Sequence, residues 1–466
     1  MSKESRLIKN TLILFIGVVG TRLISFIMLP FYTDWLTIDE YGVIDIFNTI
    51  VSMCVPILTL QVEQAVFRFM IDDKTLDDYR LTVSNGFLCL AVVLVIVDIP
   101  MGIYLITIKA FTYALYLVAI NLQCVYVMFQ QIIRGEGKNQ IYTANSILLA
   151  FSNVCFSILF IRILGKGALG YVGAFCLAHI CAVIFMIAQS NIVSIFRISA
   201  IQLKKIKELL AYSLPMIVNN VSWWILNASD KLILNFFVGI SANGIFAAAG
   251  KIPGLVTTVY TVFQMAWQES TSREKGTDIG RFYSDVFRKL YAVISYFVVC
   301  MLLLGNIVFN VLISSKFEEA YKHVPILTVA LLFLCISQFY GGIYVGLKRA
   351  KELGWTSAVA AIVNLLIDII LVKKLGIYAA SLSTLLAYLV LCIIRVLSSK
   401  SLCTIAYKSN ELIVTGFLIF ASFLIAYSSS LLLHMAAFIV ATIVFLEMYK
   451  DIVIDITGML KRKFSR

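Results

Sequence analysis

Charge is scarce in this chain: only 14% of its 466 residues are Asp, Glu, Lys or Arg, against about 25% in soluble proteins. The three histidines, His179, His323 and His434, stand far apart, and none of the ten cysteines forms a C-x-x-C pair. The sequence therefore has neither metal-ligand spacing nor a redox motif. No segment between the apolar runs is long enough for a soluble catalytic domain. Together these absences argue against an enzyme of conventional kind.

A phosphate-binding loop is missing too, although one segment looks similar to it. GIFAAAGKIPGLV (Gly244–Val256) has five residues between Gly244 and Gly250, and Lys251 is followed by Ile and Pro. A nucleotide P-loop needs four residues between its glycines and a Ser or Thr after the lysine. The segment is better read as a lysine placed inside a membrane.

Long apolar runs dominate what is present. The chain is 61% hydrophobic with a mean hydropathy of +0.94, and a bilayer-spanning helix needs roughly 20 mainly apolar residues. We predict an all-α polytopic membrane protein with about fourteen spans and no cleavable signal peptide. The predicted spans are 10–31, 43–66, 82–106, 112–133, 141–163, 171–190, 212–237, 244–268, 288–313, 324–346, 355–372, 377–398, 411–430 and 431–449.

The basic residues predict the orientation. Most Lys and Arg fall in the loops that are cytoplasmic if the N-terminus is inside, so we expect both termini in the cytoplasm. The net charge of +12 then reflects contact with anionic lipid head groups, and no nucleic acid is expected as a partner.

Two internal sequence matches predict that the chain is duplicated. Glu40–Ile50 matches Ala242–Ile252 at an offset of 202, and Phe151–Gly165 matches Ile362–Gly376 at an offset of 211. Duplicated helix bundles are common in transporters. The sequence predicts a six-helix bundle over 1–200, a second over 201–400, and two further helices with a basic tail over 401–466.

Polar residues recur along single faces of corresponding spans in the two halves. In the second span they run from Asp45 to Thr59 and Glu63, three or four residues apart. Charges at bilayer depth are costly, so such residues face a bundle interior or a water-filled cavity. We expect a substrate cavity lined by Arg22, Asn227, Lys231, Lys251 and Gln264, with Asp45 and Asp230 as candidates for ion coupling.

Other interpretations of these charges stay open. Arg22 with Asp45, or Asp230 with Lys251, could form a buried structural ion pair, and a long basic side chain could instead reach the membrane surface. A second group of charges lies near predicted span ends, where an anchoring role is expected: Asp98, Asp368, Arg395 and Glu447.

The segment NASDKLILNFFVGISANGIFAAAGKIPGLV (Asn227–Val256) resembles one family closely. It has an Asp-basic pair, an apolar run, Gly-Ile-aromatic, small residues, and a basic residue before Ile-Pro. The opening NTLILFIGVVGTRLISF and the later KKLGIYAASLSTLLAYLV are similar to the same family. These are the O-antigen type polysaccharide-repeat lipid flippases of the multidrug/oligosaccharidyl-lipid/polysaccharide exporter superfamily.

The resemblance implies a fold, a substrate and a mechanism. Relatives have two six-helix bundles arranged as a V, many with two extra C-terminal helices. They turn oligosaccharides on undecaprenyl diphosphate from the cytoplasmic to the outer leaflet of the bacterial inner membrane by alternating access, for O-antigen, capsule or other surface polysaccharide. No cofactor is expected, although coupling to H⁺, Na⁺ or the membrane potential is possible. The expected partners are membrane lipids and the polysaccharide polymerase and chain-length machinery, and the chain is expected to be a monomer.

Arg22, Lys231 and Lys251 fall where such flippases place basic cavity residues, but Thr49 stands in the first half where the second has Lys251. Two rival functions remain. A cation-coupled multidrug exporter of the same fold would require an acidic cavity. A membrane polysaccharide polymerase or glycosyltransferase would require a sizeable catalytic loop. Within the leading class, a peptidoglycan-precursor flippase is also possible.

Overall fold

The computed structural model describes residues 20–73, 75–110, 112–190, 195–273, 279–347, 349–452 and 454, and all the regular secondary structure in them is helical. At several positions within α10 and α12, Asn227 among them, the backbone alone is described. Ten helices in this part of the chain are long and apolar enough to cross a membrane. The prediction of an all-helical, multi-pass membrane protein is confirmed.

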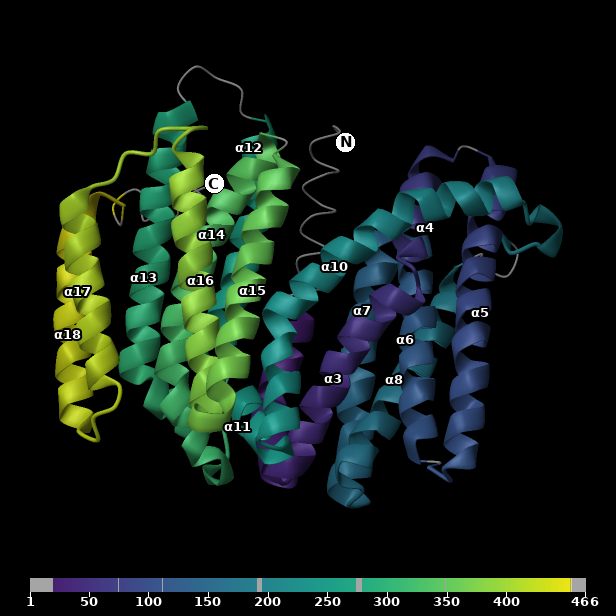
Figure 1. The fold of residues 1–466 in the computed structure, drawn as a ribbon, viewed down its shortest axis with the longest axis horizontal. Coiled ribbons are helices and arrows are strands. Elements are labelled where there is room, and N and C mark those ends of the chain that lie inside the picture. The colour runs from purple at the N-terminus through teal and green to yellow at the C-terminus, as the bar shows by residue number, and fades with distance from the viewer. Residues whose placement is uncertain are drawn as a thin grey trace, which may run out of the picture. The chain divides into compact units, whose positions relative to one another are not determined.

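Two compact units divide the chain, Met1–Ala228 and Ser229–Arg466, and Figure 1 labels their helices. The boundary falls inside α10, whereas the bundle boundary at residue 200 and the V arrangement stay predictions. The first unit contains residues 20–27 in helical conformation, followed by α2 (Leu29–Trp35), α3 (Ile38–Leu58), α4 (Val62–Asp72), α5 (Leu76–Thr107), α6 (Thr112–Gly135), α7 (Asn139–Ser157), the π-helix η1 (Ile158–Ile163), α8 (Gly167–Gln189), η2 (Ile198–Ala200) and most of α10 (Leu203–Phe237).

The second unit begins with the end of α10. It continues with α11 (Ile240–Ala249), α12 (Gly254–Arg273), α13 (Ile279–Leu312), the 3₁₀-helix η3 (Ser315–His323), α14 (Val324–Gly346), α15 (Ala350–Leu375), α16 (Ile377–Ser399), α17 (Ser409–Ile425) and α18 (Leu431–Met448). Most predicted spans coincide with helices, because an apolar run is a stretch in which only a helix satisfies the backbone in lipid. However, α10 and α13 each begin nine residues before the predicted spans over 212–237 and 288–313.

Side-chain caps set where helices of the first unit begin. The hydroxyl of Thr37 accepts from the backbone N–H of Glu40, and the Glu40 carboxylate accepts from the N–H of Thr37 at 2.9 Å, so α3 begins with a capping box. Thr75 and Asp78 form the same motif at the start of α5. These caps satisfy N–H groups that the first helical turn leaves without partners.

Two predicted spans are broken in the structure. The predicted helix over 43–66 divides into α3 and α4, with Thr59–Gln61 between them. The predicted helix over 244–268 divides into α11 and α12, and Lys251 lies in the turn between the two. Pro253 has no N–H to donate, which favours a helix boundary at this turn.

The two C-terminal helices belong to the second unit. α17 and α18 lie side by side and pack against α13 (Figure 1). The Arg288 guanidinium on α13 forms two hydrogen bonds with the Glu411 carboxylate on α17, at 2.7 and 2.8 Å, and a further pair with Asp451 beyond α18. The Arg288 guanidinium also holds the pKa of the Asp451 carboxyl below its usual range. Ion pairs as well as apolar packing therefore hold the predicted pair of C-terminal helices against α13.

Candidate functional site

The predicted substrate-binding residues are divided between the two units. Arg22 is exposed in the first unit, on the helical residues that precede α2. In the second unit Lys251 is exposed in the turn between α11 and α12, while Lys231 on α10 and Gln264 on α12 are half-buried. The side chain of Asn227 lies outside the described residues. Whether these groups share one cavity stays a prediction.

Asp230 belongs to a buried polar cluster in the second unit. Its carboxylate accepts a hydrogen bond of 2.6 Å from the Thr384 hydroxyl on α16, and it also contacts the carboxyl group of Asp368 on α15. The residue next to it on α10, Ser229, donates to the side-chain oxygen of Asn364 at 3.2 Å. The end of α10 therefore meets α15 and α16, two consecutive helices that come much later in the sequence.

Asp368 was expected to anchor a span end, and this expectation is wrong. The residue is 1% exposed and accepts a 2.7 Å hydrogen bond from the Ser383 hydroxyl. The reason is that α15 continues to Leu375, so Asp368 lies well inside the helix and faces α16. Sequence reasoning missed its pairing with Asp230, although Asn364 and Asp368, one helical turn apart in an apolar run, gave a signal for it.

The two carboxyl groups can hold one positive charge between them. Asp230 is 6% exposed, and Oδ1 of Asp230 and Oδ2 of Asp368 accept from no donor within the described part of the chain. Neither carboxyl group forms an ion pair there. Two carboxylates in contact and out of water cannot both stay ionised without a shared proton or a cation. Two carboxyl groups with the hydroxyl groups of Ser383 and Thr384 beside them can hold a proton or a monovalent cation.

Asp45, the other candidate for ion coupling, lies in the first unit. It is 7% exposed on α3, and its backbone carbonyl accepts from the Thr49 hydroxyl at 2.8 Å. The carbonyl of Thr49 in turn accepts from the indole N–H of Trp224 on α10 at 3.2 Å. As for the alternative ion pairs, Asp230 contacts Asp368 and Thr384 rather than Lys251.

Arg395 was also expected to anchor a span end, and although it lies near the end of α16, the expected anchoring role is wrong. It is 1% exposed on α16. Its guanidinium donates to the carbonyl of Ser337 at 3.0 Å, to the hydroxyl of Ser357 at 2.9 Å and to the hydroxyl of Thr356 at 3.2 Å. The buried arginine therefore joins α14, α15 and α16 through neutral acceptors, which points to a structural role.

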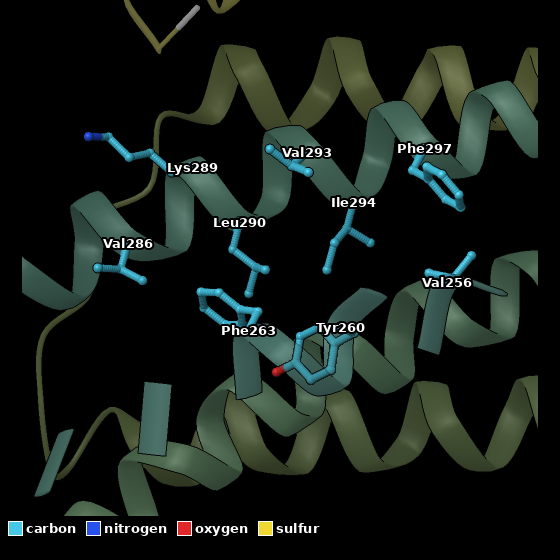
Figure 2. A pocket seen from close by; sticks show the side chains of 9 residues that line it. All are labelled: Val256, Tyr260, Phe263, Val286, Lys289, Leu290, Val293, Ile294 and Phe297. Atoms are coloured by element: carbon cyan, nitrogen blue, oxygen red, sulfur yellow. The ribbon is translucent and has the colours of Figure 1, made fainter. Parts of the chain in front are cut away.

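An apolar cavity of about 320 Å³ lies between α12 and α13. Figure 2 shows the rings of Tyr260 and Phe263 facing Leu290 and Ile294 across it, and Lys289 extending away at one end. Apart from Lys289 at one end and the hydroxyl of Tyr260, the lining is apolar, so a hydrocarbon chain fits its chemistry better than a sugar or a diphosphate does.

Comparison with known proteins places this geometry in context. A family model described as polysaccharide biosynthesis protein matches residues 7–267. The fold is similar to the lipid II flippase MurJ in an inward closed conformation, at 12% identity and a TM-score of 0.71, over 96% of this chain and 100% of that one. It is also similar to an inward-facing multidrug resistance transporter of the MATE family, at 14% identity and a TM-score of 0.69, over 83% of this chain and 94% of that one.

A curated relative is an uncharacterized membrane protein of Methanocaldococcus jannaschii. It is 23% identical over 199 residues, which cover 41% of this chain and 39% of that protein. The chain thus matches about two fifths of the length of this relative. At these identities the structural likeness shows the fold, and the family match carries the link to polysaccharides.

Proposed function

Because the chain belongs to the family of polysaccharide biosynthesis proteins, we propose that it is a flippase for a lipid-linked oligosaccharide. The substrate is an oligosaccharide on undecaprenyl diphosphate, and the chain moves it from the cytoplasmic to the outer leaflet of a bacterial plasma membrane. The observation that carries this proposal is the family match over more than half of the chain. A fold shared over its whole length with a lipid II flippase supports it.

Basic side chains hold the diphosphate during the crossing. Lys251 is exposed at the break between α11 and α12, and Arg22 is exposed in the first unit. The attraction between such a cation and a phosphate strengthens as the surrounding dielectric falls. With the cell interior negative, moving two negative charges outward across about 100 mV releases on the order of 4–5 kcal/mol. The membrane potential can therefore help to drive the head group out.

The Asp230–Asp368 pair binds the coupling ion. The pair takes up a proton or a monovalent cation as α10, α15 and α16 come together, because the two acids repel each other without one. Release of the ion loosens the contact between α10 and the other two helices. Release of the ion can thereby be coupled to binding of the next substrate molecule, and no covalent step is needed.

Reconstitution tests the proposal directly. The protein is placed in liposomes that contain fluorescent undecaprenyl-diphosphate-linked oligosaccharide, and translocation is measured as loss of the label to a membrane-impermeant quencher. We expect Lys251→Ala and Arg22→Ala to abolish translocation, and Lys251→Arg to retain part of it. Lys400→Ala is the matched control, since Lys400 is exposed in the loop after α16. Wild-type rates in both alanine variants would overturn the role of these cations.

The same liposomes distinguish the rival functions. A multidrug exporter would move a cationic dye such as ethidium and leave the lipid-linked sugar in place. A polymerase or glycosyltransferase would lengthen the oligosaccharide, which mass spectrometry of the extracted lipid would reveal. Translocation of a peptidoglycan precursor on the same carrier, measured beside that of a polysaccharide repeat, shows which of the two substrates the protein moves.

A further inference from the structure

The break between α3 and α4 is an unusual piece of backbone. Leu60 and Gln61 both adopt the left-handed conformation, with φ of 50° and 55°. Residues other than glycine, Asn and Asp rarely do so, because the Cβ atom approaches the backbone. Both lie inside a predicted membrane span, where an interrupted helix is tolerated only if protein or water satisfies the backbone. Strain of this kind is often found at functional positions.

Side chains hold the break in place and connect it to α10. The Thr59 hydroxyl accepts from the backbone N–H of Gln61 at 3.2 Å. The side-chain oxygen of Gln61 accepts from the Asn220 amide on α10 at 3.0 Å. Thr59 and Gln61 are 1% and 6% exposed, so both bonds are shielded. The conformation of the break is therefore coupled to the position of α10 within the first unit.

A buried carboxyl group stands directly after the break. Glu63, in the first turn of α4, is 3% exposed, and its Oε2 atom accepts from no donor in the part of the chain that the structure describes. The side chains of Thr59 and Gln64 lie beside the carboxyl group. Thr59 therefore links the break and the acid: its hydroxyl accepts from Gln61 and lies where it can donate to the Glu63 carboxyl group.

Among the titratable groups of the described residues, the thiol of Cys124 on α6 lies near Glu63. Cys54 on α3 and Asp98 on α5 lie near Cys124 in turn, and Asp98 is hydrogen-bonded to Asn121. Glu63 has no ion pair among the described residues. The N-terminus of α4 favours the ionised carboxylate, but desolvation without a counter-ion opposes it and is the larger effect in a bundle interior.

We propose that Glu63 is a proton-binding site of the first unit, and that its protonation controls the break at Leu60–Gln61. With the proton bound, the neutral carboxyl group fits the bundle interior and Thr59 holds the break. When the proton leaves, the carboxylate requires water, which enters at the break and competes for the bonds of Thr59 and Gln61. The contact between Gln61 and Asn220 then weakens, and α10 is released. The site is separate from the Asp230–Asp368 pair, which lies in the other unit.

Labelling with dicyclohexylcarbodiimide tests the site in the full-length protein. This apolar reagent enters bilayers and reacts with protonated carboxyl groups, and mass spectrometry of peptides locates the adduct. In liposomes we expect an adduct on Glu63 that decreases about tenfold for each pH unit above half-titration. The matched control is Glu208, a glutamate exposed on α10, which should stay unlabelled at neutral pH. Thr59→Ala removes a donor that favours the ionised form, so the labelling curve should move to higher pH.

Hydrogen exchange tests the link to the break. After correction for the intrinsic rate, peptides over 57–66 should lose protection as Glu63 loses its proton. Glu63→Gln, which mimics the protonated form, should keep protection at every pH. An absent Glu63 adduct at all pH values, or equal loss of protection in wild type and Glu63→Gln, would overturn the proposal. Neither measurement uses a substrate, so such a failure would leave the flippase proposal standing.

Discussion

Asp368→Asn replaces one of the two acids in the second unit without changing its size. In the wild type, the Asp230 and Asp368 carboxyl groups touch while Ser383 donates to Asp368 at 2.7 Å. An asparagine can still accept from Ser383 through its oxygen. Its amide can also donate to the oxygen of Asp230 that lacks a donor in the described structure. The substitution therefore exchanges a contact that requires an ion for one that does not.

Two effects set the size of the change. A hydrogen bond to a charged group contributes about 1.5–3 kcal/mol, so the variant should be more stable than the cation-free wild type by this order. The folded wild type binds a proton that the unfolded chain releases, so its stability falls as the pH rises. This loss is about 1.4 kcal/mol for each pH unit while the folded pair keeps its proton. If Na⁺ substitutes for the proton, a concentration of 100 times Kd restores about 2.7 kcal/mol.

Thermal unfolding in detergent, followed by intrinsic fluorescence, measures these effects. We expect the midpoint temperature of unfolding of the wild type to decrease as the pH is raised from 6 to 8 in choline chloride. The midpoint temperature of Asp368→Asn should change much less. Replacing choline with sodium separates a proton site from a sodium site. Asp285→Asn, which removes an exposed acid on α13, is the matched control and should behave as wild type. An Asp368→Asn variant with the full pH and cation response of wild type would refute the assignment of the ion to this pair.

Two further predictions concern packing in the second unit. A Cβ atom on Gly342 would lie 2.4 Å from the Trp267 ring, whereas one on Gly354 would meet nothing within 4 Å. Gly342→Ala should therefore destabilise the folded protein by about 1–3 kcal/mol, and Gly354→Ala should stabilise it by about 0.5–1 kcal/mol. Thermal unfolding measures both changes. Arg288→Gln and Glu411→Gln should each loosen α17 and α18 from α13, so protease sensitivity of this pair should rise. The double variant should be less destabilised than the sum of the two, by about 1–2 kcal/mol; additivity would show that the ion pair contributes nothing.

The extents of the helices were predictable from the sequence because apolar runs and lipid leave the backbone little choice. The pair α17 and α18, for example, follows the predicted spans 411–430 and 431–449 closely. The breaks between α3 and α4 and between α11 and α12 were not predictable, because a run of apolar residues does not specify the backbone angles at which a helix is interrupted. Leu60 in particular is a poor candidate for positive φ. Its conformation depends on contacts such as that between Gln61 and Asn220, which are distant in the sequence.

The candidate site was predictable in part for a similar reason. A single acid inside an apolar span, such as Asp230, signals a functional position by its energetic penalty alone. Its partner depends on which helices meet, and a span boundary placed a few residues too early turned Asp368 from a buried partner into an expected anchor. Arg395 was misjudged for a different reason: the end of its span was predicted correctly, but its neutral acceptors on α14 and α15 give no charge pattern in the sequence.

The two halves that the sequence matches predict to be duplicated both contain a broken span, but the charge beside the break differs. Each half has a span that breaks, at Thr59–Gln61 in the first and near Lys251 in the second. A broken helix exposes backbone N–H and C=O groups, so in a membrane it has to lie against protein or a water-filled space. Each break has a charged residue beside it, Glu63 in one half and Lys251 in the other. Because Glu63 is buried and Lys251 is exposed, the first is suited to bind a proton and the second to bind an anionic substrate. A duplicated bundle that assigned both tasks to both halves would place an acid beside a base at each break, where the two would form an ion pair. The division avoids this neutralisation and makes Lys251→Glu a sharper test than Lys251→Ala: it should abolish binding of the diphosphate while Glu63 labelling stays unchanged.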